Sequence, residues 1–254
     1  TSGMFYDATS FNQPIGDWSM GNVQDTSGMF QDAEVFNQYI GYWDISSDVT
    51  RTDMFVNSKI YNDNSGSSGL YAGLGNKGDH FFSKTRITNS NLKTAITDGY
   101  FDWSGNYGPI EKWDVRQVTD MSNAFHGKNN FNKDISEWNM EEVTDTSEMF
   151  RSAEKFNKPI GDWSMGNVEN TSGMFRSANA FNQDISGWNM GKVKNTSGMF
   201  YDATAFNKPI GDWSMGKVTD TSEMFRGAEN FNQDIGDWNM GEVTDTSHMF
   251  RDAT

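Results

Sequence analysis

Residue types that could carry out catalysis or bind a transition metal are scattered along this sequence. The three histidines are His80, His126 and His248, and their separation does not match the ligand spacing of a zinc site. The chain has no cysteine, so disulfides and thiolate ligands are excluded. It also lacks a nucleophile elbow and a phosphate-binding glycine loop. We therefore expect a protein that is not an enzyme and that has no cofactor.

Oxygen ligands are plentiful, and two groups of them could attract cations. The segment 62–66, Asn-Asp-Asn-Ser-Gly, has some oxygen donors of a calcium loop, but it lacks the acidic triad and the distal bidentate glutamate. Acidic residues also recur at Asp17, Asp162, Asp212 and Asp237. The sequence favours a solvated face for these carboxylates, and bound Ca2+ is the open alternative.

Two asparagines are candidate glycosylation sites. Asn170 and Asn195 are each followed by Thr-Ser, which makes both of them acceptor sequons. Other repeats have aspartate at the same position, so a structural role in a turn explains the residue type equally well. These aspartates are Asp25, Asp145, Asp220 and Asp245.

The charge of the chain restricts its partners. The formal net charge is -15 and the isoelectric point is about 4.5. This excludes a nucleic-acid partner, because phosphates select basic faces, and it disfavours anionic membrane surfaces. No apolar run is long enough to cross a membrane, so we expect no direct membrane insertion.

A repeat of 25 residues organises most of the chain. The regular units share a Phe-Asn pair, a Trp seven residues later and a closing Met-Phe pair, and the variants of these pairs are Tyr61-Asn62 and Ala124-Phe125. Units with Pro at one position alternate with units that have Asp there, so the duplicated element spans two units. The tryptophans of the pattern are Trp18, Trp43, Trp113, Trp138, Trp163, Trp188, Trp213 and Trp238.

A single unit has too few apolar residues to form a core by itself. Stacked units would bury these residues in continuous columns, and each large apolar side chain buried in this way contributes roughly 1.5–3 kcal/mol. We interpret the tryptophans as a core ladder, with a sugar-stacking platform as the alternative. The asparagine that follows each Phe is expected to form a second ladder, whose amides satisfy backbone groups at a bend.

Threonines form a further column, at Thr26, Thr146, Thr171, Thr196, Thr221 and Thr246. Regular threonine rows can present an ice-binding face. The companion column two residues earlier is interrupted by Gln24, Glu169 and Lys194. We therefore favour a role of the hydroxyls in bonding neighbouring coils.

The fold expected from these patterns is a repeat solenoid of mainly β and irregular coils. One short strand per coil is expected near Val-x-x-Thr-Ser-x-Met-Phe, where β-branched residues gather. The repeats form a first block, 1–62, and a second block, 106–254, separated by an insertion at 63–105. The insertion begins as a Gly- and Ser-rich flexible loop. It continues as a short helix with Leu92, Ala95 and Ile96 on one face and Asn89 or Ser90 as its cap.

The first and last nine residues are the same half-coil, and neither has a polar capping unit. Two interpretations stay open: the sequence is a window of a longer array, or protomers stack head to tail into filaments. The candidate residues for such assembly are Thr1, Met4, Phe5, Met249, Phe250 and Thr254.

The segment 113–125, Trp-Asp-Val-Arg-Gln-Val-Thr-Asp-Met-Ser-Asn-Ala-Phe, and the segment 131–138, Phe-Asn-Lys-Asp-Ile-Ser-Glu-Trp, resemble the BspA-like leucine-rich repeat surface proteins. This resemblance covers nearly the whole chain except about 63–83. It implies a leucine-rich-repeat-like stack, a cell-surface or extracellular location and a role in adhesion. One departure is that most coils have Thr where the family has Met, as at Met121.

Together these observations predict an extracellular structural or adhesive repeat protein that forms head-to-tail filaments. Its expected partners are further copies of itself, other surface proteins or glycans. The alternatives are a repeat module that binds a peptide or glycan and, less favoured, an ice-binding protein.

Overall fold

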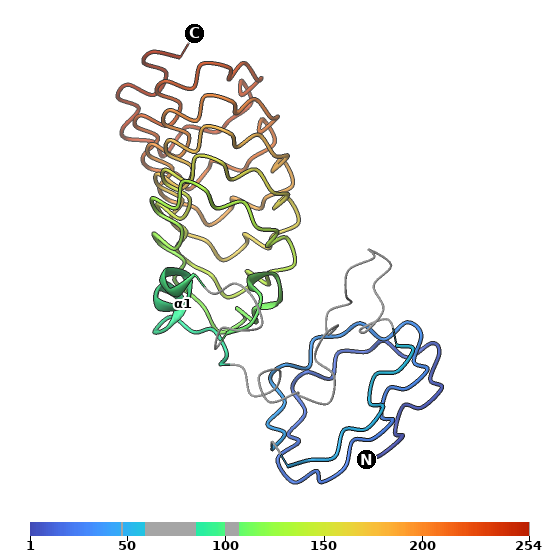
Figure 1. Cartoon of the computed structure of the whole chain (residues 1–254). Helices are drawn as coiled ribbons and strands as arrows, with labels where there is room; N and C mark the ends of the chain where they lie inside the picture. The colour runs from blue at the N-terminus through green and yellow to red at the C-terminus, as the bar shows by residue number, and fades with distance from the viewer. Residues whose placement is uncertain (47, 59–84, 100–106, 254) are drawn as a thin grey trace. The chain divides into compact units, whose positions relative to one another are not determined.

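The computed structural model describes residues 1–46, 48–58, 85–99 and 107–253 (Figure 1). The chain divides into two compact units. The first contains the described residues up to Arg86 together with Tyr107 and Gly108, and the second contains Ile87–Gly99 and the chain from Pro109 onward. The segment proposed as a calcium loop, 62–66, and His80 lie outside the described residues.

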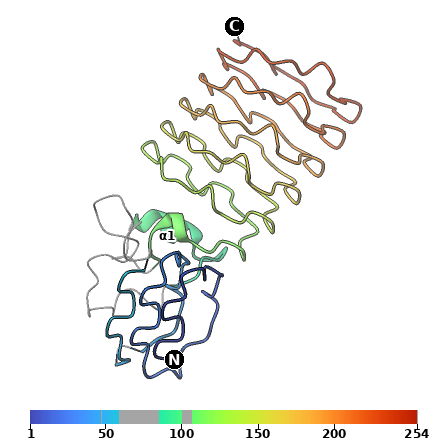
Figure 2. The same ribbon diagram turned by 90° about the vertical axis from the view of Figure 1, so that its right-hand side faces the viewer.

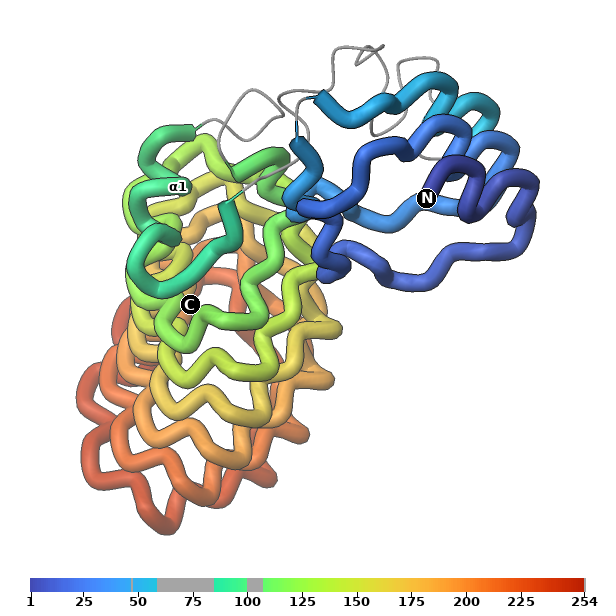
Figure 3. Tube along the Cα trace, turned by 90° about the horizontal axis from the view of Figure 1, so that it is seen from below, coloured from blue at the N-terminus to red at the C-terminus, as the bar shows by residue number. Residues whose placement is uncertain are grey.

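In each unit the chain winds into coils that repeat every 25 residues, and successive coils lie against one another (Figure 2). Backbone amides of one coil donate to carbonyl oxygens of the next. The amide of Phe150 lies 2.9 Å from the oxygen of Met174, and the amide of Phe200 lies 2.8 Å from that of Met224. Figure 3 shows the equivalent turns of the second unit following one another.

The Thr-Ser-x-Met-Phe segment consists of tight turns in which alternate amides bond in different directions. The amide of Met174 donates back to Thr171 within its own coil, whereas the amides of Gly173 and Phe175 donate to the next coil. The backbone takes a left-handed conformation at Gly173, with φ 59°, and at Ser177, with φ 56°. This alternation prevents a continuous extended chain.

Where the sequence predicts one short strand per coil, the described residues form single-residue parallel bridges instead. In the second unit these bridges join Asp120, Asp145, Asn170, Asn195, Asp220 and Asp245 in succession.

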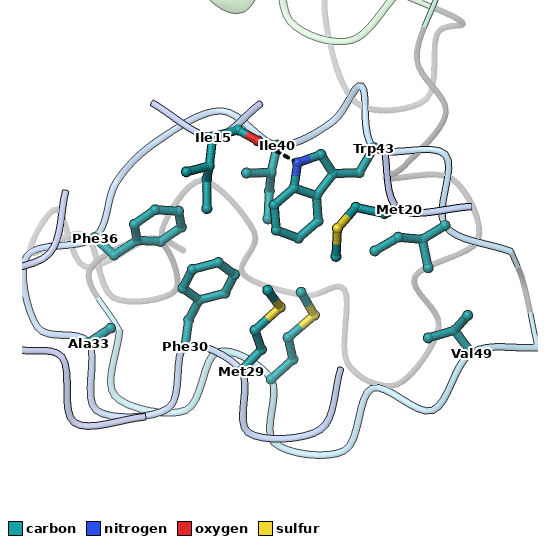
Figure 4. Packing of buried hydrophobic residues seen from close by; sticks show 11 residues of the cluster. Ile15, Met20, Met29, Phe30, Ala33, Phe36, Ile40, Trp43 and Val49 are labelled. Atoms are coloured by element: carbon teal, nitrogen blue, oxygen red, sulfur yellow. Dashed lines mark hydrogen bonds between the residues drawn. The ribbon is translucent and has the colours of Figure 1, made fainter. Parts of the chain in front are cut away.

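Two phenylalanine columns and one tryptophan column fill the interior. In one coil of the second unit, the rings of Phe175 and Phe181 are stacked with centroids 3.9 Å apart. The ring of Phe175 also stacks on the equivalent Phe200 of the next coil, at 5.7 Å. The first unit repeats this packing, with Phe30 and Phe36 stacked at 4.1 Å beside Trp43 (Figure 4).

Polar ladders accompany the apolar columns. The side-chain oxygens of Asn12, Asn132, Asn157, Asn182 and Asn207 accept the backbone amide of the equivalent asparagine in the next coil, as from Asn182 to Asn157 at 3.0 Å. The threonines of the Thr column are fully buried, except Thr246 of the last coil, which is exposed, and the hydroxyl of Thr171 donates to the carbonyl of Asn195 at 3.2 Å. The hydroxyls therefore face neighbouring coils, and an ice-binding surface would have to use the interrupted companion column.

The second unit begins with α1, Leu92–Asp98, and a short 3-10 helix, η2, Ile110–Lys112. The buried residues of α1 are Leu92, Ala95 and Ile96, the apolar face expected from the sequence. Neither Asn89 nor Ser90 is the N-cap of α1; that position is held by Asn91.

Asn89 instead forms hydrogen bonds with residues of the first coil of the second unit. Its side-chain oxygen accepts the amides of Thr119 at 2.9 Å and Asp120 at 3.2 Å, and its side-chain nitrogen donates to the hydroxyl of Thr119 at 2.8 Å. In later coils the equivalent amide donates to the preceding coil, as from Thr144 to the carbonyl of Thr119. The Asn89 amide thus takes the place of a preceding coil.

Candidate functional site

The tryptophan column is buried and is bonded to the coil before it. The rings of Trp188 and Trp213 stack at 6.3 Å, as do those of Trp18 and Trp43. The indole nitrogen of each tryptophan from Trp138 onward donates to an isoleucine carbonyl 28 residues earlier, as Trp43 does in the first unit. Among the tryptophans that the structure describes, only Trp18 is substantially exposed, at 38%. The other ring faces are therefore covered and do not offer a sugar-stacking platform.

The column that contains the two sequons caps turns wherever it has Asp or Asn. The side-chain oxygens of Asn170 and Asn195 accept the backbone amides of Ser172 and Ser197 at 3.0 and 2.8 Å. The carboxylate of Asp245 does the same for Ser247 at 2.8 Å. Both asparagines are half-buried. Capping of a turn thus explains the Asp and Asn residues of this column without an attached sugar.

Hydrogen bonding in these turns lowers the pKa of several carboxylates. Asp245 has a lowered pKa because the backbone amide and hydroxyl of Ser247 donate to its charged form. Asp184, in a separate column, has a lowered pKa for the same reason, through Ser186. These groups therefore stabilise turns in their ionised form.

The exposed acidic residues named in the sequence analysis do not converge. Asp162, Asp212 and Asp237 are exposed, and Asp17 forms an ion pair with Arg86. Among the residues that the structure describes, no group of three His, Asp or Glu residues is arranged to hold a metal ion. His126 lies beside Asn123 and 3.7 Å from Glu148, and His248 belongs to a different coil.

The candidate assembly residues lie on outer coils of the two units. Met4 is 54% exposed and Phe250 is 47% exposed, whereas the equivalent Phe225 is fully buried under the coil that follows it. Thr1 is exposed, Phe5 is half-buried and Met249 is buried. Thr254 lies outside the described residues.

A column of cationic residues is the main surface feature that the sequence analysis missed. Four of the chain's seven arginines, Arg151, Arg176, Arg226 and Arg251, directly follow the closing Phe of their coils. Tyr201 occupies the same position between two of them, with the guanidinium of Arg176 4.1 Å and that of Arg226 5.1 Å from its ring centroid. The recurrence of a cation after Met-Phe in so acidic a chain is the signal that could have revealed this column.

Next to the arginine column lies an open hollow of about 210 Å3. Its walls come from consecutive coils, and Gly173 and Gly198 occupy the position where neighbouring coils have Glu148 and Glu223. The missing side chains of the two glycines leave the space open. Its lining residues are Glu148, Ser172, Gly173, Arg176, Ser197, Gly198, Ser222 and Glu223.

Within the described ranges, every helix is too short or too polar to span a membrane.

Comparison with known proteins gives one family. No curated protein and no solved structure matches the chain. A family model described as "Mycoplasma protein of unknown function, DUF285" matches residues 1–68, 90–208 and 183–254, which together make up most of the sequence. Two of the matched segments overlap, as expected of tandem repeats. The chain is therefore a tandem-repeat protein that belongs to the DUF285 family.

Proposed function

We propose that this chain is a structural repeat protein of the cell surface, whose coils hold a regular polar surface for contact with other molecules, and that it has no enzymatic activity. The proposal rests on the division of side chains between those that contact adjacent coils and those that remain on the outside. The aromatic rings, the Asn ladder and the buried threonines all bond or pack against adjacent coils. What remains outside is a repeated set of polar columns.

The surface location is supported by the resemblance of segments 113–125 and 131–138 to BspA-like surface repeats and by the repeat character of the matching family. The same resemblance leads us to propose a leucine-rich-repeat-like solenoid. The net charge of -15 favours a hydrated outer face and cationic or neutral partners.

Labelling of intact cells tests the location. Cells that produce the chain are treated with a membrane-impermeant amine-reactive biotin, and the thirteen lysines provide the targets. Labelling before lysis, with a cytosolic protein unlabelled in the same sample, supports the proposal. Labelling only after lysis contradicts a surface role.

End-to-end association is the second candidate, because the side chains of Met4 and Phe250 are exposed on outer coils while their interior equivalents are buried. Stacking of these coils would bury their apolar surface, and contacts that do not close would produce fibres. Analytical ultracentrifugation tests this idea. A length distribution that grows with concentration and is abolished by Phe250→Asp supports it, and a compact monomer at high concentration rejects it.

A further inference from the structure

The hollow beside the arginine column has the features of a small binding site. It holds about 210 Å3 and is open to solvent. Pockets for drug-sized ligands usually hold about 300–1,000 Å3, so this hollow suits one sugar ring or one side chain. A Cβ atom added to Gly198 would have its nearest heavy atom at 3.9 Å, which shows that the space above this glycine is free.

Equivalent serines of three consecutive coils line it, and we call them the serine row: Ser172, Ser197 and Ser222. The backbone amides of these serines are bonded to the capping Asn and Asp side chains. Within the described residues their hydroxyls form no hydrogen bond to the protein, so a ligand could engage them without displacing a contact.

The backbone amides of the two glycines in the hollow, by contrast, already donate hydrogen bonds within the protein. The amide of Gly173 donates to the carbonyl of Ser197, and the amide of Gly198 donates to that of Ser222. An extended peptide that binds by strand addition needs a free row of such groups. The hollow therefore favours a ligand that is recognised through side chains alone.

Arg176 differs from the neighbouring arginines of its column in that no carboxylate pairs directly with it within the described residues. Arg151 and Arg226 form ion pairs with Glu148 and Glu223 at 2.7 and 2.6 Å. Arg176 lines the hollow and forms no direct ion pair within the described residues, although Asp202 acts on it electrostatically from farther away. Its guanidinium is held against the ring of Tyr201, which fixes a planar donor that matches a carboxylate.

We propose that this hollow binds a glycan residue with a single carboxylate, such as a uronic acid, with the carboxylate on Arg176 and the ring hydroxyls on the serine row. The two glutamates at its ends are neutralised by their own arginines. A ligand with one negative charge therefore meets one cation that no carboxylate pairs directly within the described residues, whereas the acidic chain as a whole would repel a polyanion. This site would add a binding activity to the proposed structural role and is tested separately from it.

The experiment uses the full chain and two matched disaccharides, cellobiouronate and cellobiose, which differ in one carboxylate. Calorimetric titration is expected to show tighter binding of cellobiouronate. Arg176→Gln should weaken its binding by about tenfold or more, the effect of losing a charge-assisted hydrogen bond, and leave the weak binding of cellobiose unchanged. Arg116→Gln, which makes the same change outside the hollow, should have no effect.

A second variant fills the hollow without changing the fold. Gly198→Glu places at φ 57° a residue that the chain already accepts at Glu148 and Glu223, both with φ 54°. It should abolish binding of both sugars and lower the midpoint of thermal unfolding only slightly, because a Cβ atom at a left-handed position is mildly strained while the fold tolerates it in the neighbouring coils. Equal affinity for the two disaccharides, or full binding by Arg176→Gln, would overturn the proposal. Tighter binding of a short glutamate peptide at the same residues would do so as well, because it would assign the hollow to a protein partner.

Discussion

The indole nitrogen of Trp188 donates a hydrogen bond to the carbonyl oxygen of Ile160, 28 residues earlier, at 2.9 Å. Both residues are buried, and the bond crosses from one coil to the one before it. The tryptophan therefore provides apolar surface for its own coil and satisfies a buried backbone acceptor of the preceding coil. This double role makes neighbouring coils depend on each other.

Replacement of Trp188 by Phe should destabilise the second unit by about 2–4 kcal/mol, because the Ile160 carbonyl loses its donor and a cavity forms. Urea unfolding of the full chain measures the effect. Trp18→Phe is the matched control, since Trp18 is partly exposed and its indole nitrogen donates no hydrogen bond within the described residues. A loss as large in the control would contradict the role of the inter-coil bond.

Asn89→Ala should expose the edge of the first coil in the second unit. Two backbone amides, of Thr119 and Asp120, would lose their acceptor, at a cost of about 1–3 kcal/mol. Hydrogen exchange should show faster exchange of these amides, while the amide of Thr219, which donates to Lys194, stays protected. Asn89→Asp keeps the acceptor and loses the donor to the Thr119 hydroxyl, so it should be intermediate. Unchanged exchange at Thr119 in the alanine variant would refute the capping role.

Left-handed positions should prefer glycine. At Ser177, with φ 56°, the glycine variant is expected to be more stable than the alanine variant by about 1 kcal/mol, because a Cβ atom is strained in this conformation. The exposed Ser164 has no positive φ, and there alanine should be the more stable of the two. Thermal unfolding of the four variants tests the reversal, and the same preference at both sites would disprove it.

Acid should weaken the turns that are capped by carboxylates. The pKa of Asp184 in the folded chain lies below its ordinary value of 3.8 because Ser186 donates to the charged form. The stabilisation is therefore complete above that value and is lost as the pH falls through the lowered pKa. Denaturant midpoints of the natural chain and of Asp184→Asn should approach each other between pH 7 and about pH 3. A constant difference across this range would exclude the ionised cap as the cause.

The residue spacing was sufficient to place the main columns. Trp163, Trp188 and Trp213 recur every 25 residues between apolar neighbours, and the structure places them one above another with their indole nitrogens bonded alike. The same reasoning extends to the Asn ladder, since a strict repeat puts identical side chains within bonding distance of each other. The leucine-rich-repeat-like class and the domain boundaries at 63 and 105 stay predictions.

Backbone conformation was harder to anticipate from residue types. The β-branched residues of Val-x-x-Thr-Ser indicated a strand, but left-handed residues such as Glu148 and Ser177 turn the chain away from it. Glu has little preference for that conformation, so its presence gives no local signal. The hollow was equally hidden, because it depends on which residues of neighbouring coils face Gly173 and Gly198.

The side-chain amide of Asn89 accepts the hydrogen bond that a backbone carbonyl of the preceding coil accepts elsewhere in the second unit. The first coil of such an array needs a hydrogen-bond acceptor from outside the repeat, whereas every later coil receives that acceptor from the coil before it. Because a single side chain provides the first acceptor, whole coils can be gained or lost downstream without redesign of the beginning. Related proteins of very different length could therefore share one starting segment.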